Sequence, residues 1–226
     1  MRKHYLTIIV YFFVCLPVFS LNLTGTTWGP EKRGFGFYLT FNTNKDFKLE
    51  FSGEGGGQGV IGVYLQKHDE VILSIVTIND WGELPSYTKQ KEIKCKIVET
   101  DSLFSKYKIV GSGGLELWSL KHKPADGEKC IIDGFVIYSY STDGKVNDNA
   151  RIREGPGLQY KFYSFSFNDF SEVHNSLPKG YRVKVLGHSE NKTIVEGVEH
   201  SWLYCVFEKS MWDDQYCWIW GGLIDY

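Results

Sequence analysis

The sequence lacks several features that would assign it to a common class. Beyond its first twenty residues, it has no apolar run that reaches the roughly 20 residues needed to span a bilayer. It shows almost no helical amphipathic period, so little helix is expected. Basic residues are not in excess, because 25 Lys and Arg face 27 Asp and Glu, which argues against a nucleic-acid partner. No histidine stands at close metal-ligand spacing with another histidine or a cysteine pair, so neither a metal nor another cofactor is expected.

Catalytic patterns are also scarce. The segment GQGVIG at residues 57–62 fits the glycine spacing of a dinucleotide-binding loop, but it runs into a strand-like segment and reads as a glycine-rich hairpin. His200 and Cys205 could form the base and nucleophile of a thiol enzyme. Cys205, however, lies within a strand-like run, whereas a nucleophile usually sits on an exposed turn or at a helix start. We therefore expect that the protein is not an enzyme.

The first twenty residues are typical of a secretory signal peptide. Arg2 and Lys3 precede a short apolar run, and Val18 and Ser20 occupy the positions where small residues are expected before a cleavage point. The alternative is an uncleaved anchor helix. Removing this segment takes away two positive charges and no acid, so the formal charge changes from −2 to −4. The mature chain is expected to be exported to the periplasm, the outer envelope or the medium.

Four cysteines remain in the mature chain: Cys95, Cys130, Cys205 and Cys217. In an oxidising compartment they allow three pairings. Cys205 and Cys217 lie in two strand-like runs joined by a charged loop, and facing Cβ atoms of neighbouring strands come within about 4.5–5.5 Å. We expect a disulfide there, which leaves Cys95 to pair with Cys130. The alternative is four buried free thiols.

Short alternating or apolar runs separated by Gly, Asn, Asp and Ser fill nearly the whole mature chain, which is typical of an all-β protein. In the run FKLEF, for example, Phe47 and Leu49 share one face while Lys48 takes the other, as in a half-buried strand. Seven or eight such runs between residues 24 and 121 suffice for an antiparallel meander that closes into a small barrel.

Two domains are therefore predicted after the signal peptide at residues 1–20. The stretch KHKPADGEK is charged, contains Pro and Gly, and lacks an apolar period, as a linker does. The predicted organisation is a small antiparallel β-barrel over 21–120, a linker over 121–132 and a second small β-barrel over 133–226.

The start of the first domain resembles a lipocalin-like barrel. Gly25 and Trp28 supply the Gly-x-x-Trp start of that family, and the hairpin-like segment TFNTNKDF follows. The resemblance implies a meander barrel whose mouth holds a small apolar ligand. The alternative is a barrel filled by its own side chains.

The second domain carries four ordered submotifs: ARIREGPGLQY, LPKGYRVKVLG, SWLYCVF and CWIWGGLI. Together they resemble the bacterial SH3 domain over residues 149–226. The matching positions are Ile152, Arg153, Gly155, Pro156, Lys179, Gly180, Trp202, Tyr204, Val206, Trp218, Ile219, Gly221 and Ile224. The resemblance implies an SH3-like β-barrel that binds a cell-wall peptide or another envelope ligand.

The expected binding surface of this domain combines cationic and aromatic residues. Its members are Arg151, Arg153, Tyr160, Phe165, Phe167, Trp202 and Trp212. Arg151 and Arg153 flank an inward Ile152 and could clamp a carboxylate, or they are plain solvent-facing strand residues. The insertion FYSFSF has one aromatic face, which is either a recognition loop or part of the core.

These patterns predict an exported, non-enzymatic binding protein of the bacterial cell envelope. Its partner would be a cell-wall peptide or an envelope protein held by the SH3-like module. One alternative is a carrier of a small apolar ligand in the first barrel. Another is an accessory of a cell-wall hydrolase.

Overall fold

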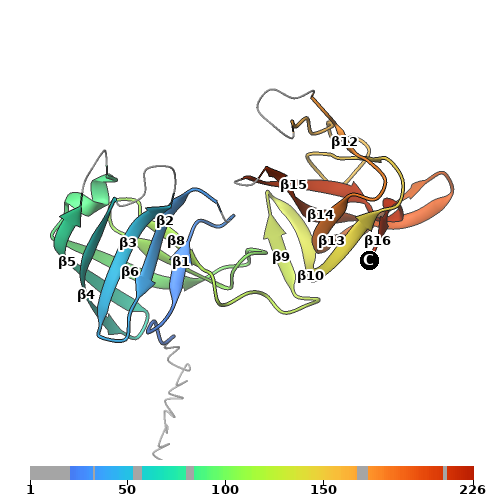
Figure 1. Ribbon diagram of the computed structural model, residues 1–226. Coiled ribbons are helices and arrows are strands. Elements are labelled where there is room, and N and C mark those ends of the chain that lie inside the picture. The colour runs from blue at the N-terminus through green and yellow to red at the C-terminus, as the bar shows by residue number, and fades with distance from the viewer. Residues whose placement is uncertain (1–20, 33, 53–57, 80–83, 167–172, 211–212) are drawn as a thin grey trace, which may run out of the picture.

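The computed structural model describes residues 21–32, 34–52, 58–79, 84–166, 173–210 and 213–226. The predicted signal peptide lies outside the described residues, as do Phe167 and Trp212. The prediction of an all-β chain is confirmed, and the strands form two separate antiparallel units (Figure 1). Within the described ranges, no helix is both long enough and apolar enough to cross a membrane.

The first unit is the predicted barrel. Its strands are β1 (Thr27–Gly29), β2 (Gly36–Phe41), β3 (Asp46–Ser52), β4 (Gly59–Lys67), β5 (Glu70–Asn79), β6 (Glu92–Glu99), β7 (Tyr107–Gly111) and β8 (Glu116–Ser119). Each strand pairs with its neighbour in the chain, and β1 also pairs with β8, which closes the barrel. One turn of 3-10 helix, η1 (Ser86–Lys89), lies between β5 and β6. Closure leaves this sheet without an unpaired edge.

Alternation along the strands fills the middle of the barrel with apolar side chains. In β3, Phe47 and Leu49 are buried, whereas Lys48 is exposed. The barrel side chains with no solvent-accessible surface include Trp28, Leu39, Phe41, Phe47, Leu49, Leu73, Ile93 and Ile109. A void large enough for a water molecule would give such side chains accessible surface, so none touches them. This part of the barrel is filled by its own residues.

The second unit is a bent sheet rather than a closed barrel. Its strands are β9 (Lys129–Ile132), β10 (Phe135–Val146), β11 (Ala150–Arg151), β12 (Ser176–Leu177), β13 (Arg182–Val195), β14 (Val198–Ser210), β15 (Asp213–Trp220) and β16 (Ile224–Asp225), with a 3-10 turn η2 (Gly221–Leu223) before β16. The main order is β15-β14-β13-β10-β16, while β9 pairs with β10 and β11 pairs with β12. The SH3-like barrel expected here is therefore a half-barrel, with the short β11–β12 pair as a separate sheet.

The two faces of this sheet bury different residues. On β14, Leu203 and Cys205 point into the inner core, which also contains Ile152 and Val185. Trp202 and Tyr204 alternate with them and join a second apolar cluster on the outer face. The other buried or partly buried aromatic rings of that outer cluster are Phe104, Phe135, Tyr216, Trp218 and Trp220. Both faces of one end of the sheet are thus covered.

A loop of the barrel, residues 100–106 between β6 and β7, covers part of that outer face. The backbone N–H of Ile131 donates to the carbonyl oxygen of Asp101 at 2.7 Å, and Ser102 forms a parallel bridge with the same residue. Leu103 is buried in the outer cluster of the second domain. This loop joins the two units through both backbone and apolar contacts.

Side chains add to the junction of the two units. The rings of Phe104 and Tyr216 meet edge to face with centroids 5.4 Å apart. Lys32, between β1 and β2, places its Nζ 2.9 Å from both carboxylate oxygens of Asp133 in the β9–β10 turn. Through these contacts, the aromatic end of the second sheet packs against the barrel.

The predicted linker is longer than the observed one. Residues 129–132 of the proposed 121–132 linker form β9, which pairs with β10 and contributes Cys130 and Ile132 to the outer cluster. The sequence reading missed β9 because it is only four residues long and directly follows the charged run. The connection between the units therefore ends at Glu128.

Gly62 offers a test of the close-packed barrel interior. A Cβ on Gly62 would lie 2.1 Å from the carbonyl oxygen of Ser74 and 2.7 Å from the ring of Phe47. We expect Gly62→Ala to lower the free energy of unfolding by about 1–3 kcal/mol, measured by urea denaturation. The exposed neighbour substitution Ile61→Thr should change it by no more than about 0.5 kcal/mol. Equal stability of Gly62→Ala and the wild type would show that the interior has room to spare.

Candidate functional site

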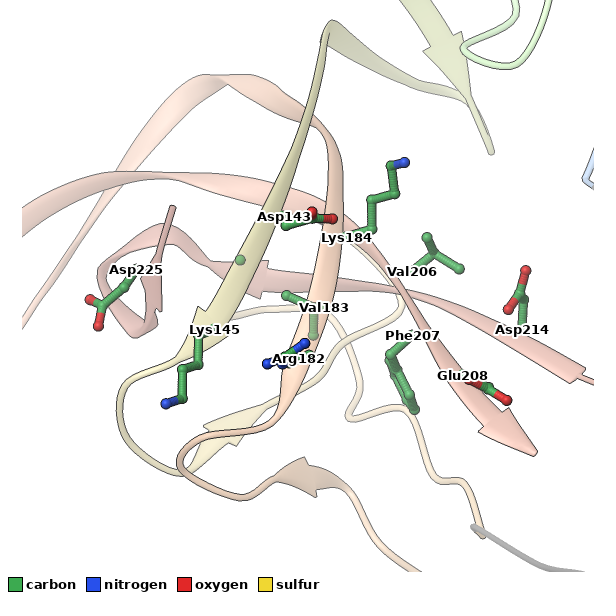
Figure 2. Close-up of a pocket in the computed structure, with 11 residues that line it drawn as sticks. Asp143, Lys145, Arg182, Val183, Lys184, Val206, Phe207, Glu208, Asp214 and Asp225 are labelled. Atoms are coloured by element: carbon green, nitrogen blue, oxygen red, sulfur yellow. The ribbon is translucent and has the colours of Figure 1, made fainter. Parts of the chain in front are cut away.

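An open groove crosses the outer face of the second sheet at the end that the barrel does not cover (Figure 2). Its volume is about 610 Å³, within the range of small-ligand sites, about 300–1,000 Å³. The lining residues come from β10, β13, β14, β15 and β16: Asp143, Gly144, Lys145, Arg182, Val183, Lys184, Val206, Phe207, Glu208, Asp214 and Asp225. The groove is therefore built on hydrogen-bonded strands rather than on loops.

The alternation of β13 and β14 sends the charged residues of this groove outward. Arg182 and Lys184 are exposed, whereas Val183 between them is buried in the inner core. Glu208 is likewise exposed beside the buried Phe207. Because the apolar neighbours are fixed in the core, the charged side chains are held at defined positions along the sheet.

The strand register sets the order of charge across the groove. On β10, Lys145 lies opposite Asp225 of β16 and also opposite Arg182 of β13. On the other side, Glu208 of β14 lies opposite Asp214 of β15. The cations therefore occupy the centre together with Asp143, which lies opposite Lys184. One further acid lies at the β16 edge, and two acids lie over β14 and β15. Figure 2 shows the same order, from Asp225 at one side to Asp214 at the other.

Hydrogen bonds hold both sides of the groove. At the β16 edge, Asn147 Nδ2 donates to Asp225 Oδ1 at 3.0 Å and to the carbonyl oxygen of Gly222 at 3.3 Å. On the β14 side, the hydroxyl of Tyr181 donates to the carbonyl oxygen of Glu208 at 2.9 Å. Of the charged side chains that line the groove, Asp225 alone takes part in these hydrogen bonds among the described residues. Ion pairs among the described residues involve none of Lys145, Arg182 and Glu208.

The predicted arginine pair forms a second, smaller cluster. The guanidinium carbons of Arg151 and Arg153 lie 4.9 and 4.4 Å from the centroid of the Phe162 ring. Arg153 Nη1 also donates to the carbonyl oxygens of Leu158 and Tyr160, at 3.0 and 2.6 Å. Burial, and secondarily the nearby charge of Arg151, lowers the pKa of Arg153. Arg153 is thus used partly to hold the turn that follows it.

Two aromatic members of the predicted surface are buried, which corrects their assignment as ligand contacts. Phe165 is 4% exposed and lies in the inner core beside Phe207. Trp202 is 2% exposed; its Nε1 donates to Thr193 Oγ1 at 2.8 Å, and the guanidinium of Arg153 lies 5.9 Å from its ring. The sequence left two possibilities for Phe165, a recognition loop or core packing, and the structure shows core packing.

Tyr160 serves the turn rather than an open surface. Its ring meets that of Phe135 edge to face at 5.2 Å. A Cβ on Gly155 would lie 2.5 Å from the same Tyr160 ring, which explains why glycine precedes Pro156. The structure therefore brings Arg151, Arg153 and Tyr160 together around one turn, while Phe167 and Trp212 lie outside the described residues.

The groove residues were missed because charged residues on a strand carry no sequence signal that separates a binding site from ordinary solvent exposure. The alternation in YRVKVLG sets Arg182 and Lys184 on the face opposite Val183, but it does not show which other strands lie beside them. Lys145, Glu208 and Asp214 come from distant parts of the chain and meet only through the register of β10, β14 and β15.

The predicted disulfides are not found, and all four cysteines are free thiols in this structure. Cys95 packs in the barrel core and Cys130 in the outer cluster of the second domain, so these two are in separate cores. Cys205 and Cys217 do face each other across β14 and β15, as expected. The backbone N–H and C=O of Trp218 both bond to Arg153, so Cys217 belongs to a hydrogen-bonded pair, in which facing Cβ atoms lie farther apart than a disulfide prefers.

His200 and Cys205 do not form the thiol site that the sequence could suggest. Cys205 points into the inner core with no accessible surface, while the ring of His200 lies against Trp220, centroids 5.4 Å apart, on the opposite face. Burial raises the pKa of the Cys205 thiol far above its usual value. Across the described segments, no three His, Cys, Asp or Glu side chains are grouped so that they could hold a metal ion.

Comparison of the chain with protein-family models, with curated proteins and with solved structures finds no significant match. The functional argument therefore depends on the geometry of the groove and on the chemistry of its side chains.

The buried thiols predict slow alkylation. Burial raises the pKa of Cys95 from 9.0 to about 12, which lowers its thiolate fraction roughly 1,000-fold at neutral pH. We expect iodoacetamide at pH 8 to label the reduced, folded protein at least about 100-fold more slowly than the protein in guanidinium chloride, followed by mass spectrometry. Fast labelling of Cys205 in the folded protein would instead reveal an accessible nucleophile.

Proposed function

We propose that this protein is an exported, non-enzymatic binding protein of the bacterial cell envelope, and that its second domain recognises a peptide of the wall or of an envelope protein. The groove on the outer face of that domain is the binding site. The observation that carries the proposal is an open groove on a rigid sheet whose charged side chains have no ion-pair partner among the described residues. Charged groups positioned in advance give specificity at low ordering cost.

The sequence supports the same assignment. The four submotifs over residues 149–226 resemble a bacterial SH3 module, whose members target wall peptides. The N-terminal segment resembles a signal peptide, which would deliver the chain to the compartment where such peptides lie. An accessory role beside a cell-wall hydrolase is a narrower form of the same binding function.

The alternative role as a carrier of an apolar ligand has less support. A carrier needs space inside the barrel, and the inward side chains there, such as Phe41 and Phe47, have no accessible surface. The groove, in contrast, is open and lined by charge. Its chemistry suits a charged peptide rather than a lipid.

Binding to isolated peptidoglycan tests the proposal. We expect the wild-type protein to sediment with sacculi and the double variant Arg182→Ala with Lys184→Ala to bind about tenfold more weakly or worse, because it loses two of the three central cations. The control is Lys192→Ala on the same strand, whose side chain pairs with Glu199 at 3.6 Å, away from the groove. A wild-type protein that binds neither sacculi nor envelope extract contradicts the proposal. Equal weakening by Lys192→Ala would show that general charge, not the groove, is responsible.

A further inference from the structure

We propose that the groove selects ligands that carry a carboxylate and an ammonium group about 10 Å apart, such as the two ends of a short extended peptide. This inference rests on the proposed binding function and names the chemical class of its ligand. It follows from two like-charge pairs that the strand register places side by side across the sheet.

The first pair is cationic and the second is acidic. Lys145 and Arg182 are directly opposite each other on β10 and β13. Glu208 and Asp214 are directly opposite each other on β14 and β15. All four side chains are exposed, and they line the same groove (Figure 2).

Like charges directly opposite each other destabilise a sheet. The repulsion between Lys145 and Arg182 is partly offset, because the acidic Asp225 lies opposite Lys145 on the neighbouring strand β16. The register that pairs Lys184 with Val206 brings Glu208 toward Arg182, which relieves part of the remaining repulsion. No described residue, however, forms an ion pair with Arg182, Glu208 or Asp214. A bound carboxylate between Lys145 and Arg182, and a bound ammonium between Glu208 and Asp214, would relieve both pairs at once.

The strand spacing gives the distance between the two subsites. Neighbouring strands lie about 4.8 Å apart, and the centres of the two pairs are separated by two such intervals, or about 10 Å. An extended chain spans at most about 3.3–3.6 Å per residue, so the termini of a tripeptide match this distance. The guanidinium of Arg182 can engage a carboxylate in a bidentate manner, which a lysine cannot reproduce.

A set of blocked peptides tests the selection. The probes are trialanine with free ends, its N-acetylated form and its C-amidated form, with binding followed by chemical-shift titration of the full protein. We expect each blocked form to bind about tenfold more weakly than the free peptide, because each loses one charge-assisted contact.

Two charge-neutral variants assign the subsites. Arg182→Gln should abolish the difference between the free and C-amidated peptides while keeping the penalty for acetylation. Glu208→Gln should do the reverse. The matched controls Lys192→Gln and Glu199→Gln, at the hairpin end of the same strands, should leave all three affinities unchanged. Both groove variants also remove a like-charge contact, so their melting temperatures should equal or exceed that of the wild type, which excludes unfolding as the cause of lost binding.

The outcomes separate the two proposals. If muropeptides bind but blocking either end of trialanine and of the muropeptides changes nothing, the charge selection is overturned and the binding function stands. If the blocked peptides lose affinity equally in the wild type and in both groove variants, the assignment of the subsites is overturned. If the wild type binds no wall peptide at all, both proposals fail.

Discussion

The described strands of this protein send alternate side chains to opposite faces, and the function proposed for the second domain depends on what covers each face. The inner face of its sheet is covered by the short β11–β12 pair and by Phe165, which bury the apolar residues of β13 and β14. Among the described strands, no second sheet lies against the outer face. Its residues must therefore be covered by something else or be compatible with water.

The outer face is divided between these two solutions. At one end, Tyr204 and Trp218 are covered by the barrel loop that carries Leu103 and by the start of β10. At the other end, Arg182 and Glu208 are exposed. The barrel thus covers the aromatic end and leaves the charged end open, so the docking of the two domains decides which part of the outer face is accessible. Under the proposed binding function, the first domain acts only by covering the aromatic end, because none of its described residues lines the groove.

The local pattern of the sequence was sufficient to predict the strands and the closed barrel, because both depend on a period of two or on nearest neighbours in the chain. The local pattern could not decide which face of the FYSFSF segment is covered. It therefore could not show that Phe165 is buried in the core rather than exposed on a binding surface. It also could not give the register between distant strands. The opposition of Lys145 to Arg182, and the hydrogen-bonded type of the Cys205–Cys217 pair, are properties of that register alone.

The same register explains how a stable sheet can hold the proposed binding site. The buried neighbours Val183 and Phe207 anchor β13 and β14, so the repulsion between exposed like charges cannot be relieved by moving the strands. It can be relieved only by side-chain rotation, by solvent or by a ligand. Each exposed like-charge contact costs a few tenths of a kcal/mol to about 1 kcal/mol, which a packed core tolerates. In the proposed site, a ligand of complementary charge removes this repulsion when it binds. The repulsion in the free protein therefore favours ligands with one pattern of charge over others.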